Sequence, residues 1–240
     1  RGGAANLYSN ISAVNDLNVF PIPDGDTGDN MYMTIRSGSS ASDGSESLAK
    51  VSSDIAHGML LGARGNSGVI LSRIFAGIAS GLSNKEYTDV QGFAEAALCG
   101  VRQAYDAVSN PVEGTMLTVY REAAEYAADN VNDSSSIVDS IRLLRDEAAR
   151  SLERTPELLQ ILKEAGVVDS GGAGLVCIID GMLDVLDGKS VAVPGADITS
   201  PSAPDLSLFT EDSVLEFGYC TEFLLRLQNC KTDLDKFSID

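Results

Sequence analysis

Apolar residues recur at spacings of three or four along most of the chain, up to about residue 187. The longest such pattern covers residues 90–108, and shorter ones cover 70–78, 137–152 and 175–186. This spacing places apolar side chains on one face of an α-helix, so each segment predicts an amphipathic helix packed against a core. Further helices are expected at 5–16, 29–36, 46–61, 115–129 and 156–165. The pattern therefore predicts an all-α protein with about eight or nine helices.

Turn-forming residues mark the expected boundaries. Thr155 is the expected N-cap of the last of these helices, with Pro156 at its first position, where a missing N–H costs nothing. After the last apolar pattern the chain becomes rich in Gly, Pro and Ser, which predicts a linker at 189–206. Residues 207–240 combine a strand-like and a helix-like segment but are too short to form a core alone. We expect a helical domain at 1–188 and, after the linker, the truncated start of a second domain.

Composition excludes several classes of protein. The 240 residues include 35 acidic and 17 basic ones, for a net charge of −18, so no basic surface is expected for nucleic acid or anionic membranes. No apolar run approaches the roughly 20 residues of a membrane span, so no integral membrane segment is expected. Four cysteines without CxxC spacing fit a reduced, cytoplasmic protein. A single histidine, His57, makes a Ser-His-Asp hydrolase a weak hypothesis.

The stretch "LNVFPIPDGDTGDNM", residues 17–31, contains the first candidate chemistry. Pro21 and Pro23 prevent a helix, so the acidic residues after them are expected on a loop. Asp24 and Asp26, one glycine apart, can direct two carboxylates at one point, where a cation would relieve their repulsion. Oxygen ligands of this kind suit Mg²⁺ or Ca²⁺. The alternative is an ordinary Asp-Gly turn that binds nothing.

Four loops share a second feature, which is a Gly, Ser or Thr placed just before a helix. In the first loop Thr27, Gly28 and Asn30 supply N–H groups, a hydroxyl and an amide, as phosphate sites at helix N-termini do. The other three loops are "GARGNSGV" (62–69), "NPVEGTML" (110–117) and "VVDSGGAGL" (167–175). Together they predict helix N-termini gathered at one end of a bundle around a polyphosphate. The alternative is that they are simple turns between helices.

These motifs, in this order and spacing, resemble the DhaL-like family. That family includes the nucleotide-binding subunit of dihydroxyacetone kinases and the N-terminal kinase domain of FakA, the ATP-binding subunit of bacterial fatty acid kinases. The resemblance spans nearly all of residues 5–187, and "EFGYCTEF" (216–223) is similar to the start of the FakA middle domain. It implies a barrel of eight antiparallel helices, with ATP at one rim and two Mg²⁺ ions between its phosphates and the aspartate loop.

The resemblance also implies roles for individual residues. Asp24 and Asp26 would be the magnesium ligands at the catalytic centre, and a third ligand would come from Asn18 or Asp29. Arg64 would counter developing charge, with a surface salt bridge as the alternative. The residues expected near the phosphates are Thr27, Gly28, Asn30, Met31, Asn66, Ser67 and Gly68, and those expected near the ribose and adenine are Thr115, Met116, Asp169, Ser170 and Gly171. The two methionines among these could equally fill the core.

The function implied by the resemblance is phosphoryl transfer from ATP to a fatty-acid carboxylate, giving an acyl phosphate. The fatty acid would be presented by a DegV-like binding protein, and the chain could itself form a homodimer. Such transfer depends on positioning and charge neutralisation, and an ionised carboxylate needs no general base, which fits motifs without histidine. The alternatives are a small-ketone kinase of the dihydroxyacetone type and a non-catalytic nucleotide-binding scaffold.

Overall fold

The structure is a computed structural model that describes residues 1–42 and 47–189. Within these ranges the chain forms ten helices and no strand, so the expected all-α fold is confirmed. The helices are α1 (Gly2–Ser9), α2 (Ile11–Asp16), α3 (Thr27–Ala41), α4 (Leu48–Leu61), α5 (Gly65–Gly81), α6 (Val90–Asp106), α7 (Met116–Asn130), α8 (Ile137–Leu158), α9 (Gln160–Ala165) and α10 (Ser170–Leu186). Apart from residue 189, the predicted linker at 189–206 and the predicted second domain at 207–240 lie outside the described residues.

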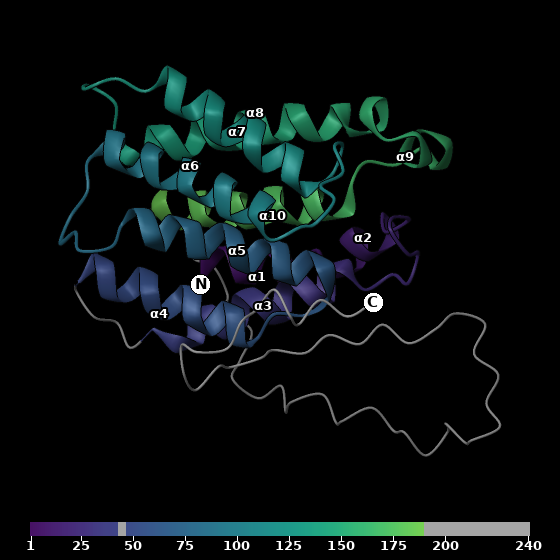
Figure 1. Ribbon diagram of the computed structural model, residues 1–240, viewed down its shortest axis with the longest axis horizontal. Helices are drawn as coiled ribbons and strands as arrows, with labels where there is room; N and C mark the ends of the chain where they lie inside the picture. Colours follow the sequence, from purple (N-terminus) through teal and green to yellow (C-terminus); the bar gives the residue numbers. More distant parts are fainter. Residues whose placement is uncertain (43–46, 190–240) are drawn as a thin grey trace, which may run out of the picture. The chain divides into compact units, whose positions relative to one another are not determined.

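The eight main helices close into a ring. From α3 to α8 each helix packs against the next, α8 packs against α10, and α1 contacts both α10 and α3. Short connections between long helices make neighbours run in opposite directions (Figure 1). The arrangement agrees with the barrel of antiparallel helices that the resemblance implies. The short helices α2 and α9 both lie at the right-hand end of Figure 1.

Close approach of α1 and α10 completes this ring. A Cβ atom on Gly2 would lie 2.3 Å from the backbone oxygen of Gly181, so a larger residue would force the two helices apart. The Asn6 side chain donates a hydrogen bond to the Cys177 carbonyl at 2.7 Å, which satisfies a polar group in the same contact. Only small residues at this point allow α1 to close the ring.

The interior is filled by the apolar faces that the sequence pattern predicts. Its fully buried large apolar side chains come from α1, α2, α3, α4, α5, α7, α9 and α10, and they are Leu7, Val14, Met31, Met59, Leu71, Ile74, Val119, Leu162 and Ile178. Burying each such side chain contributes about 1.5–3 kcal/mol to folding. None of the helices in the described ranges is long and apolar enough to cross a bilayer.

The helix expected at 5–16 is in fact two helices, α1 and α2. Asn10 separates them with backbone angles of φ −116° and ψ 8°, outside the helical range. Its side-chain amide donates to the Asn6 carbonyl at 2.8 Å, which stabilises the break. The apolar spacing continues across this break, so periodicity alone does not reveal it. The helix expected at 29–36 is correct in type but extends in both directions to the bounds of α3.

The expected helix start at Thr155 and Pro156 is wrong. Helix α8 continues through both residues to Leu158, and a separate short helix, α9, follows. Proline inside a helix leaves the carbonyl four residues earlier without its usual N–H donor. That carbonyl belongs to Leu152, and it accepts a hydrogen bond from the Thr155 hydroxyl at 2.7 Å instead. The threonine therefore compensates for the proline within the last turn of α8.

Candidate functional site

The four motif loops meet at one end of the barrel, as the sequence predicts. Ser170 at the start of α10 donates a hydrogen bond through its hydroxyl to the Thr27 hydroxyl at the start of α3, at 3.1 Å. Gly65 at the start of α5 lies against the Asn30 side chain, because a Cβ on this glycine would be 2.4 Å from Asn30 Nδ2. Gly171 lies beside Met116 at the start of α7. The N-termini of α3, α5, α7 and α10 therefore form one connected rim.

The aspartate loop brings two carboxyl groups together at this rim. Asp24 is exposed and Asp26 is half-buried. Burial raises the pKa of Asp26, and a hydrogen bond from Asn30 opposes that rise, while the neighbouring Asp24 and Asp29 carboxylates raise the pKa further. The Asp24 and Asp26 carboxyl groups also lie within hydrogen-bonding range of each other. Two acids in this arrangement favour a shared proton or a bound cation, which is the expected property of a metal site.

The two candidates for a third metal ligand are placed differently. Asn18 is 8% exposed; its Nδ2 donates to Asp24 Oδ1 at 2.7 Å, while its own Oδ1 is buried without a hydrogen-bond partner. Asp29 is exposed, and its Oδ2 accepts from the Asn15 side chain at 2.8 Å. The choice between Asn18 and Asp29 stays a prediction.

A magnesium ion fits this donor set without a third carboxylate. No group of three or more His, Cys, Asp or Glu side chains in the described part of the chain could hold a metal. Mg²⁺ keeps several waters and is commonly bound by one or two carboxylates together with phosphate oxygens. Asp24 and Asp26 would supply the carboxylates, and a nucleotide would supply the remaining oxygens.

Three of the four long helices that start at the rim lack a side-chain cap, and α10, capped by Asp169, is the fourth. The N-cap residues of α3, α5 and α7 are Asp26, Arg64 and Thr115, and none of them makes a side-chain capping hydrogen bond. Free N–H groups in a first helical turn attract anions, and the helix dipole adds to this attraction. By contrast, the helices α4, α6 and α8, which start at the opposite end, are capped by the side chains of Ser47, Asp89 and Ser136.

Gly28 is held by a residue that the sequence patterns do not single out. Its N–H donates to Asn15 Oδ1 at 2.7 Å, so this amide is already paired. A Cβ on Gly28 would lie 2.7 Å from the Ile11 carbonyl oxygen. The glycine therefore allows α2 to pack closely on α3, and its approach to a phosphate stays a prediction. Asn15 links the two helices through both ends of its amide.

Thr34 was also missed, and it connects the first two motif loops. It is fully buried; its hydroxyl donates to the Asn30 carbonyl at 2.7 Å and accepts from the Arg64 N–H at 3.2 Å. A Cβ on Gly68 would come within 2.4 Å of the same hydroxyl. Threonine within a helix is common, so no local signal distinguishes this one.

The second motif loop places its polar residues at the first turn of α5. Arg64 and Asn66 are exposed, and Ser67 is half-buried. The Arg64 side chain makes no ion pair within the described residues, although most other basic residues there are paired with acids. The surface salt bridge considered for Arg64 is therefore not formed there, and its guanidinium remains available to an anionic ligand.

The other end of the rim is more deeply buried. Asp169 and Ser170 are 5% and 4% exposed, and Met116 is buried beside them. The Asp169 carboxylate accepts hydrogen bonds from the N–H groups of Gly172, at 2.7 Å, and Met116. Burial raises the pKa of Asp169 to about 6, against the effect of these two hydrogen bonds. The carboxylate thus joins the first turns of α7 and α10.

Met31 differs from the role that the resemblance implies. It is fully buried in the core, and its sulfur lies 2.6 Å from where a Cβ on Gly174 would be. A side chain without exposed surface does not contact a ligand at the rim. Met31 therefore fills the core, as the alternative had it, and its side chain does not bind the nucleotide. The reason is the tight packing of α3 on α10, which the sequence does not reveal.

Comparison with known families matches residues 21–184 to the DAK2 domain, from within the aspartate loop to the last turns of α10. The chain belongs to the DAK2 domain family. The matched residues include all four motif loops apart from residues 17–20. The DAK2 domain therefore contains the whole candidate site except Asn18.

Two bacterial proteins are similar to nearly the whole chain. Protein YloV of Bacillus subtilis (strain 168) is 44% identical over 244 residues, covering 98% of this chain and 44% of YloV. An uncharacterized protein of Staphylococcus epidermidis (strain ATCC 12228 / FDA PCI 1200) is 43% identical over 242 residues, with the same coverage. The chain thus spans less than half the length of these relatives.

A solved structure supports the fold. The dihydroxyacetone kinase from C. freundii, crystallised in complex with AMP-PNP and Mg²⁺, aligns with a TM-score of 0.56 and 20% identity. The alignment covers 77% of this chain and 32% of that one. At this level of identity the likeness concerns the helical fold alone.

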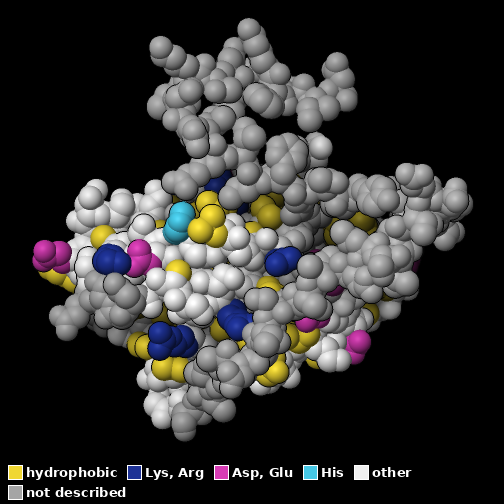
Figure 2. Space-filling view, turned by 90° about the horizontal axis from the view of Figure 1, so that it is seen from below, with side chains coloured by type: hydrophobic (Ala, Val, Ile, Leu, Met, Phe, Trp, Pro, Cys, Tyr) yellow, Lys and Arg dark blue, Asp and Glu magenta, His cyan; other side chains and the backbone are white. Residues whose placement is uncertain are grey.

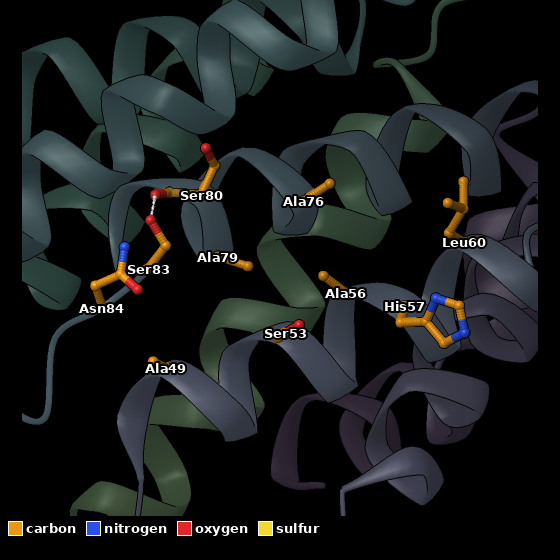
Figure 3. A pocket seen from close by; sticks show the side chains of 10 residues that line it. All are labelled: Ala49, Ser53, Ala56, His57, Leu60, Ala76, Ala79, Ser80, Ser83 and Asn84. Carbon is orange, nitrogen blue, oxygen red and sulfur yellow. Dashed lines mark hydrogen bonds between the residues drawn. The ribbon is translucent and has the colours of Figure 1, made fainter. Parts of the chain in front are cut away.

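The DAK2 domain also has a hollow of about 490 Å³ between α4 and α5. Small side chains of both helices line it, together with His57, Leu60 and Asn84 (Figure 3). None of the candidate site residues is among the lining residues. The histidine lies on the surface beside hydrophobic side chains (Figure 2). His57 is thus separate from the motif loops.

Proposed function

We propose that this chain binds Mg-ATP at the rim and is the nucleotide-binding part of a kinase that phosphorylates a fatty-acid carboxylate. The observation that carries the proposal is the pair of carboxyl groups of Asp24 and Asp26, which lie within hydrogen-bonding range at the end where three long helices begin without side-chain caps. Carboxylates for a cation beside first-turn N–H groups for phosphate, such as those of α5, are the two components that a metal–nucleotide site needs.

The DAK2 family and the dihydroxyacetone kinase crystallised with AMP-PNP and Mg²⁺ support a phosphoryl-transfer role. The resemblance to FakA supports the fatty-acid substrate. In the proposed reaction a carboxylate oxygen bonds to the γ-phosphorus of ATP as the bond to the β–γ bridging oxygen breaks, releasing ADP. The carboxylate is already ionised, so no proton needs to be removed.

Each group at the rim has a part in this proposal. One or two Mg²⁺ ions, held by Asp24 and Asp26, would neutralise charge on the phosphates. The first-turn N–H groups of α5, with the Ser67 hydroxyl, would hold phosphate oxygens in place. Arg64, which has no acidic partner among the described residues, would stabilise charge that develops during transfer.

The surface around the rim supports an acceptor presented by a partner protein. Several large apolar side chains on the connections, at the helix ends and in α9 at this end are 37% to 62% exposed. They are Ile22, Leu61, Val112, Leu158 and Ile161. Exposed apolar residues around a polar centre are typical of protein interfaces. A DegV-like protein carrying the fatty acid is the proposed partner, and it would cover the rim during transfer.

Calorimetric titration tests the nucleotide site. ATP is titrated into the full-length protein with and without Mg²⁺, and into Asp24→Asn and Asp26→Asn. We expect each substitution to weaken Mg-dependent binding at least tenfold, or about 1.4 kcal/mol, with little change in the absence of Mg²⁺. Asp129→Asn is the matched control, since Asp129 is exposed near the C-terminal end of α7. Unchanged affinity in both site variants would remove the proposed metal role.

Turnover then separates the substrates. With Mg-ATP and a fatty-acid-loaded DegV-like partner, the full-length protein is expected to release acyl phosphate and ADP. The dihydroxyacetone kinase neighbour makes a small-ketone acceptor the second candidate, tested by ADP release with dihydroxyacetone. Nucleotide binding without turnover in either assay would instead identify a non-catalytic scaffold.

A further inference from the structure

Asp169 differs from the other helix caps because it connects three helices. Its carboxylate accepts from the N–H of Gly172 in its own helix, α10, and from the N–H of Met116, the first residue of α7. Its own N–H donates to the Thr155 hydroxyl in the last turns of α8 at 3.0 Å. Thr155 is fully buried, and its hydroxyl donates a hydrogen bond to the Leu152 carbonyl. The ends of α7, α8 and α10 are thus tied together through one residue.

Asp89 shows what an ordinary cap looks like in the same fold. Like Asp169 it precedes a helix and has a glycine three positions later, and its carboxylate accepts from the Gly92 N–H at 2.8 Å. Within the described residues, the hydrogen bonds of Asp89 reach no other helix, and Asp89 lies at the barrel end opposite the rim. Asp169 differs from this local pattern in two ways: its carboxylate also accepts from a second helix, α7, and it is almost completely buried.

Burial makes Asp169 a costly choice for a cap. A carboxylate removed from water loses hydration, and its raised pKa records that cost. An exposed Ser or Asp would cap α10 about as well locally. The additional bond to Met116 is what the buried position provides. Since Gly171 lies against Met116 and Ser170 bonds to Thr27, this bond determines how α7 meets α10 and α3 at the rim.

We propose that Asp169 is a positioning residue for nucleotide binding: it holds the first turns of α7 and α10 at a fixed spacing, and Thr155 holds Asp169. In this view the carboxylate faces backbone N–H groups rather than the nucleotide. Pre-organised N–H donors bind an anion without first having to be ordered. The inference rests on the proposed Mg-ATP site and assigns Asp169 an indirect role there.

The test combines two measurements on the full-length protein. Mg-ATP affinity is measured by calorimetry, and hydrogen exchange at the starts of α7 and α10 is followed by mass spectrometry without ligand. Asp169→Asn is expected to weaken Mg-ATP binding at least tenfold and to speed exchange at both helix starts. Thr155→Val should show the same two effects, about threefold in affinity, while Thr155→Ser should restore both. Asp89→Asn is the control and should leave affinity unchanged.

The outcomes separate this inference from the proposed function. If wild-type protein does not bind Mg-ATP, the proposed function fails and the inference fails with it. If wild type binds and Asp169→Asn binds equally well, the positioning role alone is wrong. Weaker binding with unchanged exchange would show that Asp169 contacts the nucleotide directly, which also overturns the inference. Should Asp169→Asn fail to fold, the Thr155 variants decide by the same two criteria.

Discussion

Gly28→Ala tests whether the start of α3 must pack closely on α2. The added Cβ would lie 2.7 Å from the Ile11 carbonyl oxygen, 2.9 Å from Asn15 Oδ1 and 3.1 Å from Ile11 Cα. Two of these three atoms belong to the backbone of α2, so the contact is relieved only if a helix end moves. That movement would also strain the 2.7 Å hydrogen bond from the Gly28 N–H to Asn15.

The magnitude follows from three contributions. Overpacking of this kind costs about 1–3 kcal/mol. Loss or weakening of a hydrogen bond adds about 1 kcal/mol. Replacing glycine by alanine in a helix returns up to about 1 kcal/mol, and less in a first turn such as this one. We therefore expect the free energy of unfolding to fall by about 1–3 kcal/mol.

Urea unfolding, followed by circular dichroism, measures the change in stability. Ser40→Ala in the same helix serves as the control, because Ser40 is exposed and alanine there alters only helix propensity. Calorimetry on the same variants should show weaker Mg-ATP binding for Gly28→Ala alone. Asp26 directly precedes the first turn of α3, so a shift of this helix start would move its carboxyl group. A Gly28→Ala protein as stable as wild type would refute the close-packing argument.

Two further predictions concern folding stability: a buried carboxylate lowers it when charged, whereas a surface helix cap raises it. Burial raises the pKa of Asp169 from 3.8 to about 6, so the folded state binds the Asp169 carboxyl proton more tightly than the unfolded state does. The stability that this tighter proton binding provides is lost as pH rises from about 4 to 6. The stability of Asp169→Asn relative to wild type should therefore increase by about 2 kcal/mol between pH 4 and pH 7 in urea titrations, and a difference independent of pH would contradict the assigned burial. Ser136→Ala removes the capping box of α8, in which the Ser136 hydroxyl accepts from the Asp139 N–H at 3.1 Å. It should lower thermal stability by about 1 kcal/mol and leave Mg-ATP affinity unchanged, whereas a change in affinity would show that the two barrel ends are coupled.

Much of the candidate site was predictable because its chemistry is local. The spacing of Asp24 and Asp26 places two carboxylate oxygen ligands close together. The small residues before each helix place backbone N–H donors within a few residues of one another. The structure joins these loops at one rim, through contacts such as that between Ser170 and Thr27, which are 143 positions apart. The sequence did not predict the roles of Asn15 and Thr34. Each forms a hydrogen bond to another helix or loop, and neither interrupts an apolar pattern.

The amino-acid sequence by itself determined that the chain is helical, where most of its helices lie, and which loops carry the paired acids and the Gly, Ser and Thr residues that precede helices. These properties depend on residues close together along the chain, through helical periodicity and the residue types found in turns. Only the tertiary structure decided that α8 runs through Pro156, that Met31 belongs to the core, and that Asp169 connects three helices. Each of these depends on a hydrogen-bond partner or packing neighbour from a different turn, loop or helix, so its energy appears only when the barrel is assembled.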